Sequence, residues 1–195
     1  MSIPASTLTR VVRELKDLQK NPIDGVRVHP NDDDITEIAA EYDGPTGTPY
    51  EGGVFQMKLV LGDDFPSSPP RGVFLTKIFH PNVSEAGDIC VNVLKRDWSP
   101  DVGIRHVLTV VRCLLVEPNA ESALNEEAGK LLLEGFDAFA ARARLMTDVH
   151  ARRPLPLGDS KGHNTAPSGG VSKPKAKAPG AKTAKTAAKK SIRRL

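Results

Sequence analysis

The composition of this 195-residue chain changes abruptly at Arg152, and this change limits where a folded core can form. Residues 152–195 consist mainly of Pro, Gly, Ala, Ser, Thr and Lys, and they contain no Phe, Trp or Tyr. A segment with so few large apolar side chains cannot offset the conformational entropy that it would lose on ordering. We therefore expect one folded core in residues 1–151 and a disordered basic tail in residues 152–195.

Charge is divided unevenly between these two parts. The tail contains 12 Lys and Arg residues and a single acid, Asp159, whereas the first 151 residues contain 15 Lys and Arg and 23 Asp and Glu. The sequence thus predicts an acidic body attached to a basic tail. It contains no run of about 18 apolar residues and no apolar leader, so we expect neither a membrane span nor a secretory signal.

The spacing of the apolar residues predicts an α+β fold. Helical spacing from Ser6 to a stop at Asn21-Pro22 indicates an amino-terminal helix. Between residues 25 and 79, short β-prone runs alternate with Gly, Pro and Asp clusters, which predicts a four-stranded antiparallel meander. Three helical patterns follow, at residues 104–118, 125–134 and 136–151. The last of them has a predicted apolar face that contains Phe136, Phe139, Ala140, Ala143, Met146 and Val149.

The chain has only two cysteines, Cys90 and Cys113, which is too few for a disulfide framework and favours a reducing compartment. Cys90 follows a turn marked by glycine within the stretch HPNVSEAGDICVNV. On composition alone it is more typical of an inert packed thiol than of a nucleophile. No His pair or C-x-x-C spacing accompanies it, so we expect no metal site. A Cys–His protease remains an alternative, with candidate bases at His80, His106 and His150.

Several separated motifs together resemble one family. They are HPN at residues 80–82, Cys90 eight positions after the asparagine, WSP at residues 98–100 and PNAESALNEEA at residues 118–128. In this order and spacing, residues 6–151 resemble a ubiquitin-conjugating enzyme. The stretches DICVNVLKRDW, GIRHVL and ESALNEEAGKLLLE, with a Lys-rich tail that ends in Arg-Arg-Leu, resemble the S type of that family.

The resemblance implies a catalytic core in residues 1–151 with Cys90 as the thioester nucleophile. It would accept the carboxyl-terminal glycine of ubiquitin from the ubiquitin-activating enzyme and then pass it to a lysine amine. No bound cofactor is expected, because ATP is used by the upstream activating enzyme. By the same resemblance, Glu126 would orient the acceptor lysine. Asn82 would either stabilise the oxyanion or tie down its loop.

Two positions near the implied site depart from the pattern of many relatives. Leu124 and Asn92 stand where many relatives carry acids, which suggests that the acceptor ubiquitin itself supplies part of the lysine activation. His80 is expected to be structural, with its ring hydrogen-bonded to backbone.

The resemblance also implies surfaces for protein partners. The amino-terminal helix would contact the activating enzyme through exposed Arg10, Arg13 and Lys16, although a solvated basic face is the alternative. The helix with Cys113 would hold the donor ubiquitin, but Val107 and Val111 could equally be core residues. Two loops, DDFPSSPPRG and WSPD, resemble those that dock RING ligases; the first is shorter than in many relatives and lacks their aromatic residue, so generic RING docking is not assured.

The tail would then dock the ligase. Its last residues, Ile192, Arg193, Arg194 and Leu195, resemble the terminal anchor by which the S type holds the anaphase-promoting complex. That type elongates polyubiquitin chains through the lysine at ubiquitin's eleventh position, which implies roles in proteasomal degradation and the cell cycle and a location in the cytoplasm and nucleus.

Other functions remain open on the sequence alone. The tail could solubilise the protein, serve as a nuclear import patch, or bind nucleic acid as a chromatin module would, although nucleic acid is the less favoured partner. An inactive variant that binds ubiquitin without conjugating it is a third alternative.

Overall fold

The structure is a computed structural model, and it describes residues 3–31, 33–96 and 98–152. It confirms the predicted α+β fold. Helix α1 (Ala5–Lys20) comes first, followed by strands β1 (Val26–Pro30), β2 (Glu37–Asp43), β3 (Val54–Val60) and β4 (Arg71–Phe74). After the strands come helices α2 (Val91–Lys95), α3 (Gly103–Leu114), η1 (Ala120–Ser122), α4 (Glu126–Glu134) and α5 (Phe136–His150).

The four strands form one antiparallel sheet in the order β1-β2-β3-β4, as the meander pattern predicts. Successive side chains of a strand point to opposite faces of the sheet. In β3, Phe55, Met57 and Leu59 are accordingly buried, whereas Gln56 is exposed. The apolar side chains on one face of the sheet therefore form one side of the hydrophobic core.

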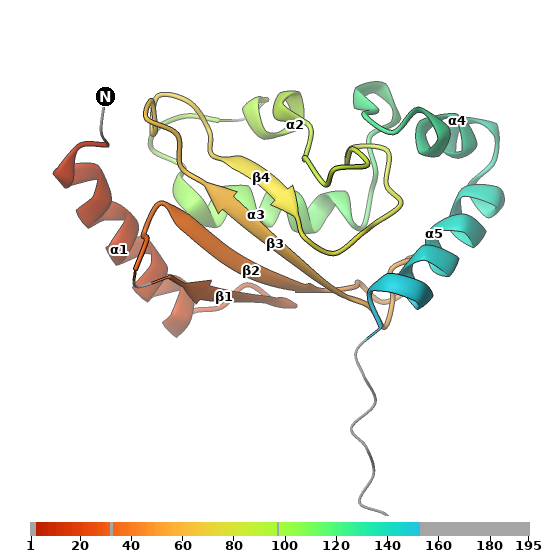
Figure 1. The fold of residues 1–195 in the computed structure, drawn as a ribbon, viewed down its shortest axis with the longest axis horizontal. Helices are drawn as coiled ribbons and strands as arrows, with labels where there is room; N and C mark the ends of the chain where they lie inside the picture. The colour runs from red at the N-terminus through yellow and green to blue at the C-terminus, as the bar shows by residue number, and fades with distance from the viewer. Residues whose placement is uncertain (1–2, 32, 97, 153–195) are drawn as a thin grey trace, which may run out of the picture. The chain divides into compact units, whose positions relative to one another are not determined.

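Helix α3 lies against this apolar face of the sheet (Figure 1). Val107, Leu108 and Val111 of α3 are buried, and the Tyr42 hydroxyl of β2 donates a hydrogen bond to the Leu108 carbonyl at 3.1 Å. Helix α1 adds three buried residues, Val11, Leu15 and Leu18. Figure 1 shows α1 at one end of the sheet and α4 with α5 at the other.

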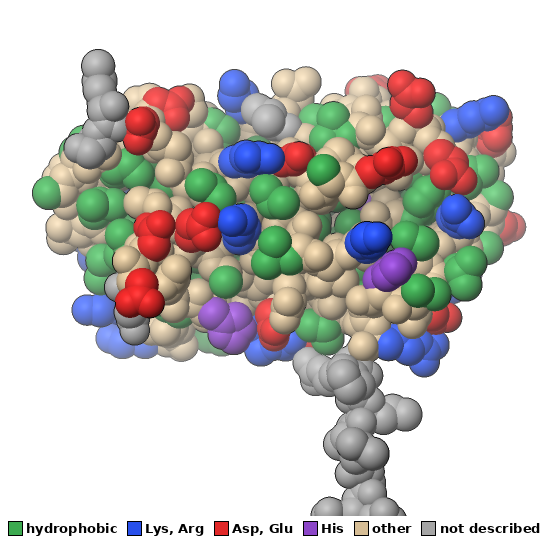
Figure 2. Space-filling model, viewed as in Figure 1, with side chains coloured by type: hydrophobic (Ala, Val, Ile, Leu, Met, Phe, Trp, Pro, Cys, Tyr) green, Lys and Arg blue, Asp and Glu red, His purple; other side chains and the backbone are tan. Residues whose placement is uncertain are grey.

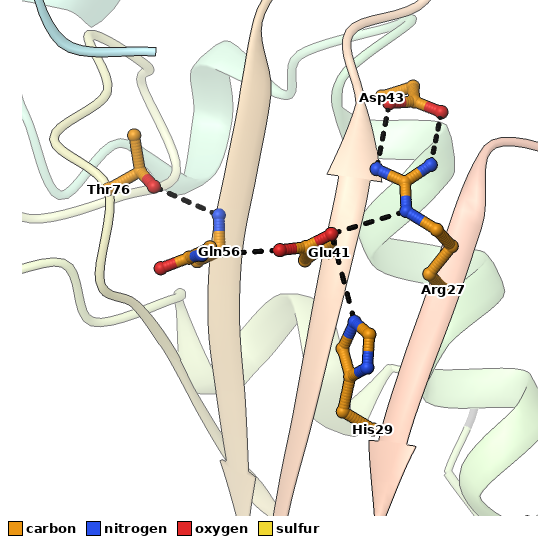
Figure 3. A network of polar contacts seen from close by, with 6 residues as sticks. All are labelled: Arg27, His29, Glu41, Asp43, Gln56 and Thr76. Carbon is orange, nitrogen blue, oxygen red and sulfur yellow. Dashed lines mark hydrogen bonds and ion pairs between the residues drawn. The ribbon is translucent and has the colours of Figure 1, made fainter. Parts of the chain in front are cut away.

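The opposite face of the sheet carries a polar network that runs across three strands (Figure 3). Arg27 of β1 binds both carboxylate oxygens of Asp43 at 2.6 and 3.0 Å and donates to Glu41 at 3.2 Å. Gln56 of β3 donates to the other oxygen of Glu41 at 3.2 Å. The Asp43 bonds raise the pKa of Arg27. The charged side chains on this polar face are thus paired with one another across neighbouring strands.

Two short helices, α2 and η1, were not predicted. They have five and three residues, which is too short for a helical period to be distinguished from other patterns. The predicted apolar face of α5 is only partly buried: Phe139, Ala140 and Ala143 are in the core, but Phe136 is 53% and Val149 64% exposed. These two residues stand at the ends of α5, which extend past the core on which the middle of the helix packs. Within the described ranges, no helix is long and apolar enough to cross a membrane.

Candidate active site

Cys90 lies immediately before α2, in a loop that is tied to the rest of the molecule by backbone hydrogen bonds. Its N–H donates to the Asn82 carbonyl at 2.9 Å, and the preceding residue, Ile89, donates to the Gly72 carbonyl at 2.9 Å. The residue is 5% exposed. The turn before it closes through a bond from Gly87 N–H to the Ser84 carbonyl at 2.9 Å. Cys90 therefore occupies a fixed and nearly buried position.

His80 is fully buried and both of its ring nitrogens are engaged. Its Nδ1 accepts the Asn82 N–H at 3.0 Å, so this nitrogen carries no proton. The neutral ring then carries its proton on Nε2, which donates to the Leu114 carbonyl at 2.9 Å. Burial lowers the pKa of His80 to about 4, although the bond to Leu114 opposes this shift. These bonds confirm that His80 is structural, as predicted.

The other two candidate bases give the protease alternative no support. His106 lies on α3 and His150 is the last residue of α5. Within the part of the chain that the structure describes, neither ring forms a hydrogen bond with Cys90. Residues 3–31, 33–96 and 98–152 thus contain no Cys–His hydrogen bond at Cys90 of the kind that activates a protease nucleophile.

Asn82 ties the Cys90 loop to the segment before α4. Its side-chain oxygen accepts the Asn119 N–H at 2.8 Å. Its amide nitrogen donates to the Asn119 carbonyl at 2.6 Å and to the Ser122 carbonyl at 3.0 Å. Both amide hydrogens are thus used, so an oxyanion could be bound only after one of these carbonyls is released. Of the two predicted roles, the structure supports loop anchoring.

The start of α4 is held against the same loop. Leu124 and Asn125 both donate their N–H groups to the Pro81 carbonyl, at 2.7 and 3.0 Å. The Asn125 side chain caps α4 by accepting the Ala128 N–H at 3.0 Å. Glu126, the first residue of α4, is exposed, and Leu124 is 45% exposed. These bonds bring both predicted residues to the loop that holds Cys90.

Asn92 lies on α2, two residues after Cys90, and is exposed. Figure 2 shows acidic side chains gathered over α4, which begins with Glu126 and Glu127. A carboxylate surface therefore lies beside the Cys90 loop, and it favours the approach of a cation.

The predicted basic face of α1 is smaller than expected. Arg10 was expected to be exposed, but its side chain is only 29% exposed, and it pairs with Glu14 at 2.7 Å and donates to the Pro100 carbonyl. The expectation is wrong for Arg10, because its guanidinium reaches the loop before α3. Arg13 and Lys16 are exposed, as predicted.

Sequence reasoning missed Glu14 and the contact between the two predicted docking loops. Glu14 accepts the Ile104 N–H at 2.7 Å and so caps the first turn of α3 from another helix. The Trp98 indole N–H donates to the Pro66 carbonyl at 3.0 Å, and its ring lies 5.8 Å from that of Phe65. A lone tryptophan in a loop was the available signal, since a partly buried indole usually finds an acceptor.

Cys113 is exposed on α3, at the edge of a cavity of about 1000 Å³. His106, Val110 and Glu117 also line this cavity. Val107 and Val111 are buried instead, which supports the core alternative for those two residues.

No group of three or more His, Cys, Asp or Glu side chains among the described residues could hold a metal ion. The predicted docking residues of the tail, Ile192, Arg193, Arg194 and Leu195, lie outside the described residues.

Comparison with known proteins defines the class to which this fold and site belong. A family model described as ubiquitin-conjugating enzyme matches residues 10–147, and the chain belongs to that family. A crystal structure from Plasmodium yoelii, described as that of a ubiquitin-conjugating enzyme, superimposes with a TM-score of 0.70 at 36% identity and covers 77% of this chain and 99% of its own. The α+β arrangement is thus that of the ubiquitin-conjugating fold.

The curated relatives point to a particular type within the family. The chain is 58% identical to ubiquitin-conjugating enzyme E2 S-B of Xenopus laevis over 77% of this chain and 72% of that protein. It is 54% identical to ubiquitin-conjugating enzyme E2 S of Homo sapiens, over 86% and 76% of the two chains. The predicted likeness to the S type is confirmed. The chain is a thioester-forming ubiquitin transferase, whose partners are ubiquitin, the activating enzyme and a ligase.

Proposed function

We propose that Cys90 is the residue that carries ubiquitin. The observation that supports this is its fixed position: its N–H is bonded to Asn82, and the same loop is bonded to the start of α4. In the first step, the Cys90 sulfur attacks the thioester between ubiquitin and the activating enzyme. One carbon–sulfur bond forms, the other breaks, and the activating enzyme regains its thiol. The exchange replaces one thioester by another, so it requires no bound cofactor.

The second step is the attack of a lysine amine on this thioester. With a reference pKa near 10.4, only about one lysine amine in 2,500 is neutral at pH 7, which corresponds to a penalty of about 4.6 kcal/mol. A nearby carboxylate alone would raise the lysine pKa further, whereas desolvation lowers it. Glu126 therefore acts by orienting the amine or by taking its proton. The isopeptide bond forms, the carbon–sulfur bond breaks, and the Cys90 thiol is regenerated.

The acceptor ubiquitin supplies part of the group that activates its own lysine. Leu124 is exposed and apolar, and Asn92 is exposed and uncharged, so neither supplies a negative charge for the ammonium group of the lysine. With Glu126 at the start of α4 as the protein's own carboxylate, the remaining activation comes from a group on the acceptor ubiquitin. The donor ubiquitin lies along α3 beside Cys113, where a cavity of about 1000 Å³ offers an open surface.

The product is a polyubiquitin chain linked through the lysine at ubiquitin's eleventh position, built on substrates of the anaphase-promoting complex. This function belongs to proteasomal degradation and cell-cycle control, in the cytoplasm and nucleus. The supporting observation is the identity of 54–58% to E2 S proteins together with the terminal Ile-Arg-Arg-Leu. Two guanidiniums suit acidic partners, and two aliphatic side chains suit a groove.

Deletion of residues 192–195 should weaken ligase-dependent chain growth by tenfold or more at limiting ligase, because a tethered enzyme works at an effective concentration on the order of millimolar. Chain growth is measured on a gel with the anaphase-promoting complex and a model substrate, and the linkage by mass spectrometry of the digested chains. Thioester formation with the activating enzyme serves as the control and should be unchanged. Equal chain growth with and without the four residues would contradict the docking role.

A further inference from the structure

A second groove lies beside the Cys90 loop, apart from the cavity at Cys113. Its volume is about 360 Å³, and four segments line it. They are residues 74–79, which begin at the last residue of β4, the turn at residues 84–87, the start of α4 with Asn125 and Glu127, and Arg142 with Met146 of α5. We call it the acceptor-side groove.

The segments that form this groove are the ones that position Cys90. Residues 74–79 lead directly into His80, and the turn at residues 84–87 leads into Cys90 through a bond from the Ser84 N–H to the Asp88 carbonyl at 2.9 Å. Asn125 donates to the Pro81 carbonyl at 3.0 Å. The groove therefore shares its walls with the segments that hold Cys90, and two of its lining residues, Asn125 and Glu127, flank Glu126 in the chain.

Two exposed cations, Lys77 and Arg142, line the groove. The Arg142 guanidinium carbon lies 5.9 Å from the centroid of the Phe79 ring, and Phe79 is buried. Stacking on a fixed ring restricts the guanidinium while its N–H donors stay available at the edge. Among the described residues, neither cation has a carboxylate partner, whereas Arg27 and Arg71 are paired with aspartates.

The rest of the lining is mixed. Leu75 is 58% exposed, and Ile78 and Met146 are half-buried, so aliphatic side chains can pack there. Glu85 and Glu127 also line the groove. They would repel an acid but attract a lysine. The groove thus offers two cations for carboxylates and, next to the Cys90 loop, carboxylates for an ammonium group.

We propose that the acceptor-side groove binds an acidic stretch of the acceptor protein next to the lysine that is modified. Arg142 grips a carboxylate in a bidentate fork, Lys77 adds a second positive charge, and the target lysine then reaches the Cys90 thioester past α4. This inference rests on the proposed function, because it needs Cys90 as the donor of ubiquitin. It assigns Lys77 and Arg142 as determinants of acceptor specificity.

The test compares acceptor peptides in single-turnover discharge of the full-length, ubiquitin-charged protein. One peptide carries a single lysine flanked by glutamates, and the matched peptide has glutamines in their place. The wild type should discharge to the acidic peptide faster by between about threefold and tenfold at low salt, since a partly enclosed ion pair exceeds an exposed one. In the double variant Lys77→Ala and Arg142→Ala, the two rates should become equal. Arg142→Lys should keep part of the preference, because it keeps the charge but not the fork.

Arg144→Ala is the matched control, because Arg144 is an exposed cation on the same helix that does not line the groove. It should keep the full preference. Discharge to free lysine should be equal in all variants, which also shows that each one folds. A preference that survives the double variant, or a wild type without any preference, would overturn the inference. Absence of a thioester on the wild type would overturn the proposed function as well.

Discussion

His80 illustrates how a residue at the site can be essential to its geometry without taking part in the chemistry. Its ring bridges the Asn82 N–H and the Leu114 carbonyl, so it joins the Cys90 loop to the end of α3. Burial keeps the ring neutral, with its pKa lowered to about 4 from an ordinary 6.5. Protonation of this ring is therefore less favourable in the folded state than in the unfolded state, where the ring is exposed to water.

A pH dependence of stability follows from this shift. Because the folded-state pKa is lower than the unfolded one, the contribution of His80 is fully present above pH 6.5 and is lost as the pH falls through 4. Between pH 7 and pH 5, the free energy of unfolding should fall by about 2 kcal/mol on account of this residue. Urea unfolding at the two pH values measures the change.

The control is His80→Gln, which keeps a hydrogen-bonding side chain but cannot titrate. Its free energy of unfolding should be lower at pH 7 and should change much less between pH 7 and pH 5. A variant with the same pH dependence as the wild type would show that other groups cause it.

The sequence could identify candidate site residues where they belong to a motif. It could not predict their hydrogen-bond partners when these lie far away in the sequence. The resemblance could identify Cys90, Asn82 and Glu126 as candidates. The sequence could not show that the Asn82 amide nitrogen donates hydrogen bonds to the Asn119 and Ser122 carbonyls, because these bonds span 37 and 40 positions. It also could not show that Arg10 reaches the Pro100 carbonyl, 90 residues away.

At the scale of elements, the start of α3 depends on α1. Glu14 of α1 accepts the Ile104 N–H at 2.7 Å and satisfies one of the free donors of the first turn. The preceding residue, Gly103, has φ of 74°, which favours glycine, and a Cβ there would overlap the Glu14 carboxylate. A Cβ at position 103 would displace the Glu14 carboxylate and break its bond to the Ile104 N–H.

Gly103→Ala should therefore destabilise the protein by about 2–4 kcal/mol, since it displaces the Glu14 carboxylate from the Ile104 N–H in addition to the strain of a left-handed backbone. Gly47→Ala is the matched control: Gly47 has φ of 78°, but a Cβ there meets nothing within 4 Å, so it should cost only about 1–2 kcal/mol. Urea unfolding of both variants measures the difference. If both variants lost the same free energy of unfolding, the contact between position 103 and Glu14 would make no contribution to stability.

Elements were predictable in proportion to their length. The sheet and the four long helices repeat apolar positions often enough to be recognised, and all of them are present. Helices α2 and η1 are too short for that signal and are fixed by contacts with the Cys90 loop and Asn82. The exposed ends of α5 could not be predicted, because the periodicity gives a face but not the extent of the core beneath it.

At the scale of the whole molecule, the catalytic body and the basic tail carry opposite charges. The buried residues of the core lie between Val11 and Ala151, so the described body accounts for the thioester site by itself. The proposed role of the tail is to bring this body to its ligase. The two steps of the reaction are then separable: charging depends on the body, and processive chain growth depends on the tail as well.

The most direct measurement is the intact mass of the protein after incubation with activating enzyme, ATP and ubiquitin. We expect a gain of one ubiquitin that a thiol reductant removes. Cys90→Ser should give an adduct that resists the reductant, Cys90→Ala should give none, and Cys113→Ser should behave as the wild type. A reducible adduct that persists in Cys90→Ala, or a wild type that never acquires one, would contradict the assignment of Cys90.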